Sequence, residues 1–282
     1  MKSILLFGGI ILGALIPQAH SLSSVVQYLL MLMLFIAFSG MSVTPKIFNK
    51  SIVLILLINI LLGFFWYYAI LHFNHTYAVI VFITAIAPTA TAAPVVVHFL
   101  KGKVEYVIAS VILTNVTIAI LLPFFTTALG ISNNKTSVLK PLTNIFIVII
   151  VPLLIAQGIR YLRPALSKKI VKYEDVSFYA WVIVIFLAVA NSSNFIRIHK
   201  EIPATNLATI ALLVLMVCAV NFTLGRLIGG DKFALEASQS LGQKNTMLTV
   251  WYSLTYLSPL IALGPVCYLV YHNAYNSYQM AH

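Results

Sequence analysis

The chain carries very little charge for its length. Only 8% of its 282 residues are Asp, Glu, Lys or Arg, and 61% are hydrophobic, whereas a soluble domain carries roughly 25% charged residues. Too few polar side chains are present to cover a water-facing surface, so lipid must be the solvent for most of the chain. This excludes a soluble enzyme or binding domain. It predicts an all-α polytopic membrane protein in which residues 1–282 form a single transmembrane unit.

Acidic residues and cysteines are also scarce. Six acidic residues leave a formal net charge of +11, but the basic residues sit in short clusters between apolar runs. The positive-inside rule explains this distribution better than a nucleic-acid partner does. The two cysteines, Cys218 and Cys267, lie inside apolar runs and show neither a disulfide framework nor metal-ligand spacing. We therefore expect no nucleic-acid partner and no obligate protein partner, with small molecules and the lipid bilayer as the partners.

Motifs of known catalytic chemistry are missing from the sequence. It contains no H-E-x-x-H, no G-x-S-x-G, no P-loop and no pair of carboxylates within an apolar run. We therefore expect that the protein is not an enzyme, needs no cofactor and is not an ATP-driven pump.

Hydropathy predicts ten spans. The first could be the apolar part of a signal peptide, but no A-x-A-like cleavage site follows it, so we interpret it as a span. Of the 17 Lys and Arg residues, twelve fall on the cytoplasmic side and four outside if the N-terminus is cytoplasmic, with Lys244 in neither set. Both termini are thus predicted to be cytoplasmic, in a bacterial inner membrane. The predicted spans are 4–17, 24–41, 51–71, 77–100, 104–129, 141–161, 177–192, 204–226, 232–254 and 257–279.

Ten spans divide into two sets of five, which would have opposite orientations in the membrane. Residues 1–130 would form the first inverted repeat and residues 140–282 the second. The fourth span of each set is interrupted: Pro88 and Pro94 bracket a Thr-rich stretch in the first, and a polar segment at 238–246 breaks the second. Paired broken helices are the best sequence indication of a transporter site at the bilayer midplane. The alternative for the first is a proline-kinked helix whose threonines bond their own backbone.

Lys244 is the strongest candidate for a functional residue. It lies about 12 residues, or roughly 18 Å, into the predicted ninth span, which is near the middle of a hydrocarbon core about 30 Å thick. Burying a lysine there costs on the order of 3 kcal/mol, so it needs a cavity, a partner or a lost proton. None of the six acidic residues is an obvious partner.

Other polar residues inside the predicted spans have weaker signals. His272 and Asn273 near the end of the last span could line a site, or could simply be interfacial or hydrogen-bonded. Taken singly, Asn59, Asn115 and Asn221 are typical of polar contacts between helices.

The order of the motifs resembles the bile acid:sodium symporter family over nearly the whole chain. The resemblance rests on Gly40-Met41 with Thr44, the Pro88–Pro94 break with Lys101-Gly102, Gly242 with Asn245, and His272-Asn273. It implies ten helices in two inverted five-helix repeats. It also implies a core domain in which helices four and nine unwind and cross, beside a panel domain of helices one, two, six and seven.

The resemblance implies a function as well. Family substrates are organic anions, from bile acids to small carboxylates, and they bind near the crossover and cross the membrane by alternating access. The resemblance implies that Thr91, Asn245, His272 and Asn273 contact the substrate, and the residues themselves add Thr89 and Lys244 as candidates. The candidate crossover and coupling residues are Pro88, Pro94, Asn115, Ser240, Gly242 and Gln243.

The sequence departs from the family at the sodium sites. Ala93-Pro94 stands where the family has Ser-Asn, and Val107 and Val111 align with residues that supply hydroxyls. The family's glutamate and glutamine in span nine align with Ser240 and Lys244. Sodium needs several oxygen ligands, and a protonated lysine would repel it by several kcal/mol at short range.

These departures lead to the functional hypothesis. We expect a secondary transporter of an organic anion in which sodium coupling is altered or lost and Lys244 stands in for the bound cation. The alternatives are a proton-coupled or facilitative carrier, a channel, or a non-transporting membrane receptor that kept the fold.

Overall fold

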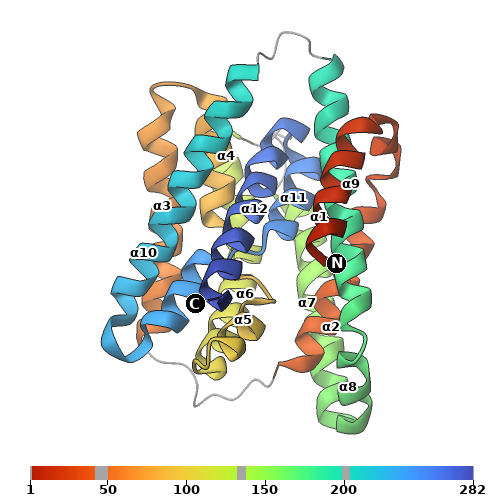
Figure 1. Cartoon of the computed structure of the whole chain (residues 1–282), viewed down its shortest axis with the longest axis vertical. Helices are drawn as coiled ribbons and strands as arrows, with labels where there is room; N and C mark the ends of the chain where they lie inside the picture. Colours follow the sequence, from red (N-terminus) through yellow and green to blue (C-terminus); the bar gives the residue numbers. More distant parts are fainter. Residues whose placement is uncertain (1, 42–49, 132–137, 199–203, 282) are drawn as a thin grey trace. The chain divides into compact units, whose positions relative to one another are not determined.

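The structure is a computed structural model that describes residues 2–41, 50–131, 138–198 and 204–281. Within these residues the chain is α-helical, and its only extended pairing is an isolated bridge between Thr89 and Lys244. Figure 1 shows the helices and both termini. The predicted all-α class is therefore confirmed.

Five helices in the described part of the chain are long and apolar enough to cross a membrane. Eighteen-residue windows within them have mean hydropathies between 1.8 and 2.4, and each helix has at least the roughly 20 residues that a crossing needs. The chain is thus a multi-pass membrane protein. The five are α3 (Lys50–Leu71), α6 (Val104–Ala128), α7 (Leu139–Leu162), α9 (Glu174–Ile198) and α10 (Ala204–Gly242).

Helices that are shorter or, in the case of the 23-residue α12, less apolar account for the remaining predicted segments, and most bounds agree with the hydropathy pattern to within three residues. Asn74 caps the start of one of them, α4, by accepting a hydrogen bond from the Tyr77 amide at 3.0 Å. They are α1 (Lys2–Leu15), α2 (Val25–Gly40), α4 (His75–Ile86), α5 (Ala93–Phe99), α11 (Thr246–Tyr256) and α12 (Pro259–Ala281).

Two short helices were not expected. The 3₁₀-helix η1 (Pro17–Leu22) follows α1, and α8 (Pro164–Val171) follows α7 after a single residue. Each begins with a proline, whose missing N–H costs nothing at the first position of a helix. Both are too short and too polar to be recognised from hydropathy.

The helix α10 contains a sharp kink. Gly230 has a positive φ of 52°, which glycine adopts without steric cost, and Phe233 also leaves helical geometry. Gly229 lies at the same bend, where an added Cβ would approach the Ala234 backbone to 2.8 Å. The kink corresponds to the boundary predicted between spans 204–226 and 232–254. It divides α10 into a long first segment and a second segment that ends at Gly242.

The chain forms two compact units, each built from both halves of the sequence. Unit 1 comprises Met1–Ser42, Ala119–Pro203 and Val250–Val266; unit 2 comprises Val43–Ile118, Ala204–Thr249 and Cys267–His282. In unit 1, α1 packs on α9, and α2 packs on α7, α8 and α9. In unit 2, α3 packs on α4, and α10 packs on α3, α4 and α5. The four helices expected for the panel, α1, α2, α7 and α9, all lie in unit 1.

Candidate functional site

Two helix interruptions meet in unit 2. The first separates α4 from α5 at residues 87–92, and the second separates α10 from α11 at residues 243–245. Thr89 and Lys244 form an antiparallel bridge between them. The Ala90 amide donates to the Gln243 carbonyl at 2.8 Å, and the Asn245 amide donates to the Pro88 carbonyl at 2.7 Å. Each interruption thereby satisfies backbone groups of the other, which is what a non-helical backbone within a membrane requires.

The two prolines of the first interruption have different roles. Pro88 lies in the non-helical stretch, two residues after α4 ends. Pro94 lies in the first turn of α5, where its missing donor is tolerated. Thr91 lies between them and is half-buried. The interpretation as a merely kinked helix is therefore wrong, because helical structure is absent from six consecutive residues.

Thr89 is the most heavily bonded residue of the first interruption and is 2% exposed. Its hydroxyl donates to the Ser240 carbonyl at 2.6 Å and lies 3.2 Å from the Ser110 hydroxyl. Its backbone amide donates to Thr114 Oγ1 at 3.0 Å. Its carbonyl accepts from Asn115 Nδ2 at 2.8 Å. Thr89 therefore joins the first interruption to both the second segment of α10 and α6.

Asn115 on α6 bridges the two interruptions. Besides the Thr89 carbonyl, its Nδ2 donates to the Val111 carbonyl of its own helix at 2.8 Å. Its Oδ1 accepts from Asn245 Nδ2 at 2.9 Å. One buried amide thus contacts both broken helices, so the polar residues predicted at 89, 115 and 245 form one cluster.

Lys244 is buried, with 1% of its surface exposed. Its Nζ donates to Oδ1 of Asn59 on α3. The Nδ2 of Asn59 donates in turn to the carbonyls of Ile86 and Ala87 at 3.0 and 3.3 Å, where α4 ends. A protonated lysine has three N–H donors, of which Asn59 takes one. The partner that the sequence did not reveal is therefore a neutral amide, so a buried positive charge would have no counter-ion in this contact.

The end of the second segment of α10 is held by α12. Tyr268 donates its hydroxyl to the Gly242 carbonyl at 2.6 Å and accepts from Asn221 Nδ2 at 3.1 Å. Gly242 itself packs against Phe222, because a Cβ added there would lie 2.3 to 2.6 Å from three ring atoms. Close packing therefore requires a glycine at the last helical residue before the interruption.

Several predicted site residues do not join this cluster by hydrogen bonds. Asn273 donates to the Leu269 carbonyl of its own helix at 2.8 Å. His272 is buried and packs edge-on to the Tyr268 ring, with centroids 5.6 Å apart. Its Nδ1 has no partner among the described residues. The same holds for two buried acceptors near the second interruption, Ser240 Oγ and Gln243 Oε1.

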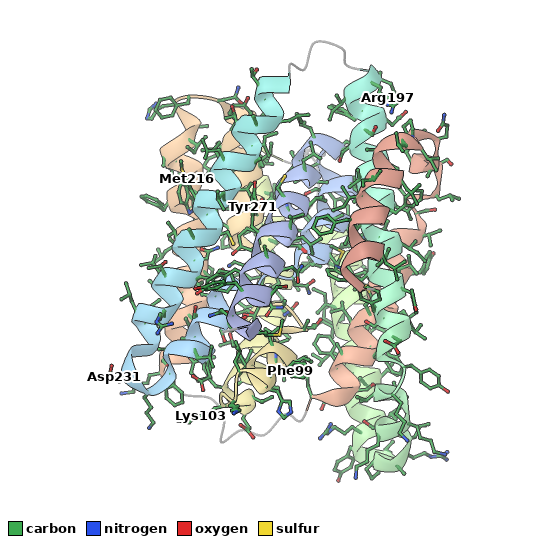
Figure 2. The ribbon with its side chains drawn as sticks, viewed as in Figure 1. Phe99, Lys103, Arg197, Met216, Asp231 and Tyr271 are labelled. Carbon is green, nitrogen blue, oxygen red and sulfur yellow. The ribbon has the colours of Figure 1, made fainter. Side chains whose placement is uncertain are left out.

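The cytoplasm-facing end predicted for unit 2 carries a further contact that the sequence did not suggest. Oε1 of Glu236 accepts a hydrogen bond from the Lys103 backbone amide at 2.7 Å, immediately before α6. A carboxylate there stabilises the start of the helix. Figure 2 shows Lys103 and Asp231 near the same end of unit 2, away from Met216.

Sequence reasoning missed Asn59 as the partner of Lys244, together with Ser110, Thr114 and Tyr268. Ser110 and Thr114 lie four residues apart on α6, and Asn115 directly follows Thr114. This polar stripe on an apolar helix was the available signal for Ser110 and Thr114. No model of a known protein family matches this chain, and no curated protein matches it.

Proposed function

We propose that the protein is a secondary carrier that moves an organic anion, either bile-acid-like or a small carboxylate, across a bacterial inner membrane by alternating access. One observation carries the proposal: two broken helices pair through their interruptions, and one of these interruptions contains a buried lysine. Broken helices of this kind expose backbone dipoles that suit ion and substrate binding within a membrane.

The finer architecture belongs to the proposal. It comprises ten crossings, inverted repeats at 1–130 and 140–282, and cytoplasmic termini. The position of the two interruptions supports it, because each falls in the fourth predicted span of its half. The grouping of α1, α2, α7 and α9 in one unit also agrees with the panel that the family resemblance implies.

A sodium ion does not fit the residues of this cluster well. Val107 and Val111 are buried on α6 and offer no side-chain oxygen, and Pro94 lies inside α5. Two buried oxygens, Ser240 Oγ and Gln243 Oε1, have no hydrogen-bond partner in the described part of the chain. Sodium needs more ligands than two, and the Lys244 ammonium would repel it. In this proposal the Lys244 ammonium is a fixed positive charge at the place where the bile acid:sodium symporter family binds a sodium ion.

Lys244 has two roles in the proposal. Its contact with Asn59 ties the second interruption to α3 and to the end of α4. Its positive charge attracts an anionic substrate to the paired interruptions, and hydrogen bonds to charged groups contribute about 1.5–3 kcal/mol each. Loss and recovery of the Lys244 proton would couple transport to a pH gradient.

Uptake into proteoliposomes tests the proposal. A panel of labelled organic anions is offered with sodium, with choline in place of sodium, and with an imposed pH gradient. We expect saturable uptake that persists in choline and falls about tenfold or more in Lys244→Gln, the loss of one charged hydrogen bond. Stimulation by the pH gradient would identify proton coupling, and its absence a facilitative carrier.

Lys232→Gln is the matched control, because Lys232 is an exposed lysine on α10, the helix that ends two residues before Lys244. It should transport like the unmodified protein. Strict sodium dependence would show that the interpretation of Lys244 as a fixed cation is wrong. Failure of every anion to show saturable uptake and counterflow would reject the carrier in favour of a receptor.

A further inference from the structure

A dense group of basic side chains lies where α7 is followed by α8, in unit 1. Only Arg163 separates the two helices, and α8 packs against both α2 and α7. The resulting bend brings α8 to the C-terminal ends of these two helices. Five basic residues fall within thirteen positions here, namely Arg160, Arg163, Lys168, Lys169 and Lys172.

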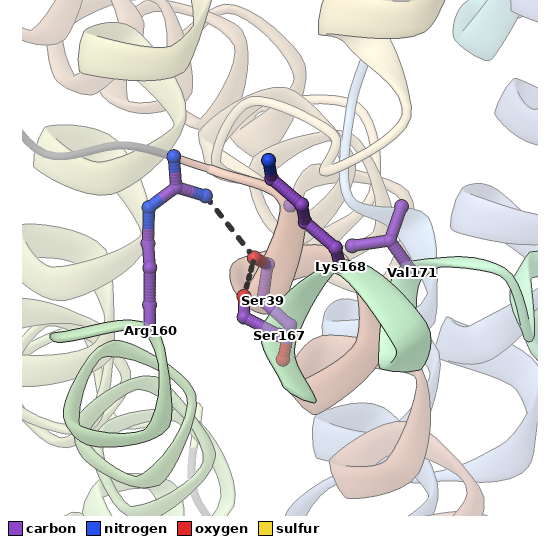
Figure 3. Close-up of a pocket in the computed structure, with 6 residues that line it drawn as sticks. Ser39, Arg160, Ser167, Lys168 and Val171 are labelled. Carbon is purple, nitrogen blue, oxygen red and sulfur yellow. Dashed lines mark hydrogen bonds between the residues drawn. The ribbon is translucent and has the colours of Figure 1, made fainter. Parts of the chain in front are cut away.

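Two of these five side chains line a pocket of about 250 Å³, which Figure 3 shows. None of the six lining residues is acidic. The volume is below the roughly 300–1,000 Å³ of pockets that take drug-sized ligands, so it suits a small group. The lining residues are Ser39, Gly40, Arg160, Ser167, Lys168 and Val171.

The wall of the pocket is held by hydrogen bonds to the end of α2. The Ser39 carbonyl accepts from Arg160 Nη1 at 3.2 Å and from Ser167 Oγ at 2.8 Å. Gln157 Nε2 donates to the carbonyls of Phe38 and Met41 at 2.9 and 3.0 Å. Carbonyls that a helix end leaves without partners are thereby satisfied by side chains, and the position of the Arg160 guanidinium is restrained.

Both cations remain able to bind an anion. An arginine has five N–H donors, and the Ser39 carbonyl takes one from Arg160. Lys168 is exposed, and Figure 3 shows Arg160 and Lys168 on either side of Ser39 with their charged ends directed to the same side. Two convergent cations with no acidic neighbour in the lining favour an anion, and arginine is especially suited to phosphate.

We propose that this pocket binds a phosphate group, supplied by the head group of an anionic lipid or by free phosphate. Its position favours such a ligand because it lies where the apolar helices α2 and α7 end, and head groups lie at the ends of membrane helices. Basic pockets of this kind between membrane helices bind anionic head groups. The site is in unit 1 and does not depend on the transport proposed for unit 2.

Lipid binding to the purified full-length protein in a neutral detergent tests the site. Native mass spectrometry follows a titration with phosphatidylglycerol, and zwitterionic phosphatidylcholine serves as the reference lipid. A hydrogen bond from a charged side chain in the pocket to a phosphate oxygen contributes about tenfold or more in affinity. The double variant Arg160→Gln/Lys168→Gln should therefore bind phosphatidylglycerol about 100-fold more weakly.

The matched control is Lys169→Gln/Lys172→Gln, which removes the same charge from neighbouring positions outside the pocket. It should bind with near-unmodified affinity. Equal weakening in both double variants would mean diffuse attraction to a basic surface and would overturn the proposal, as would equal binding of the two lipids. Lys168→Gln alone guards against misfolding, since it leaves both hydrogen bonds to Ser39 in place, and it should weaken binding about tenfold.

Inorganic phosphate is the second probe and distinguishes the two sources. Displacement of phosphatidylglycerol by phosphate in the unmodified protein, absent in Arg160→Gln/Lys168→Gln, would assign the site to free phosphate as well. A lack of displacement, together with the loss of lipid binding in the double variant, would assign it to the lipid head group.

Discussion

Replacing Gly242 with alanine tests the packing that positions the second interruption. A Cβ at this residue would lie 2.3 Å from Cδ1 and 2.4 Å from Cγ of Phe222, far inside carbon–carbon contact distances of about 3.5–4.0 Å. The ring is buried and also packs against Tyr275, with centroids 4.5 Å apart. The Tyr275 ring therefore restricts how Phe222 can move away.

The expected cost follows from these contacts. Overpacking a core costs about 1–3 kcal/mol, and the shortness of these distances puts Gly242→Ala at the upper end. The better helix propensity of alanine offsets roughly 0.5–1 kcal/mol. The net destabilisation is about 2 kcal/mol, or a fall in Tm of roughly 4–8 °C at 2–4 °C per kcal/mol.

Thermal unfolding in detergent, followed by tryptophan fluorescence, measures this change. Gly158→Ala in α7 is the control, since a Cβ there meets nothing within 4 Å, and its Tm should stay level or rise. Phe222→Leu in the Gly242→Ala background should recover much of the loss, which a double-mutant cycle quantifies. A Gly242→Ala protein as stable as the original, or one that Phe222→Leu fails to rescue, would refute the reasoning.

Two further predictions concern residues near the first interruption. Thr89→Val removes the hydroxyl that donates to the Ser240 carbonyl. A net hydrogen bond contributes about 1 kcal/mol, so Tm should fall by a few degrees and uptake should drop. The control Thr117→Val, at a half-buried position on α6, should change neither Tm nor uptake. Lys101 has a positive φ of 58°, which costs a side chain about 1–2 kcal/mol, so Lys101→Gly should raise the stability by about 0.5 kcal/mol after the entropy cost of glycine. Lys103→Gly, at a neighbouring position with ordinary φ, should lower it, and a fall in Tm for Lys101→Gly in the same unfolding assay would contradict the argument.

Much of the helical organisation could be predicted because its causes are local. Long apolar runs predict membrane helices, and prolines, glycines and polar clusters within them predict where these end. The interruptions near Pro88 and near Gln243 and the bend at Gly229-Gly230 were found in this way. The helix α8 was not, since it is short and polar and forms where it can pack on α2 and α7.

The partners of the site residues could not be predicted in the same way. Lys244 and Asn59 are 185 positions apart. A single asparagine in an apolar helix could contact any of several other helices, so the sequence does not indicate that Asn59 is the partner of Lys244. Nor does the sequence distinguish His272 and Asn273, which are adjacent on α12. His272 is buried and its Nδ1 has no partner within the described ranges, whereas Asn273 bonds its own helix.

The sequence by itself determined that this is a helical membrane protein and where its helices are interrupted, because burial in lipid imposes an apolar composition and internally satisfied backbone that can be recognised locally. Only the tertiary structure decided that the two interruptions pair with each other, that Asn115 bridges them and that a neutral amide receives Lys244. The physical reason is that a non-helical backbone in a membrane must find hydrogen-bond partners, and the sequence shows the need for partners without showing which distant segment supplies them.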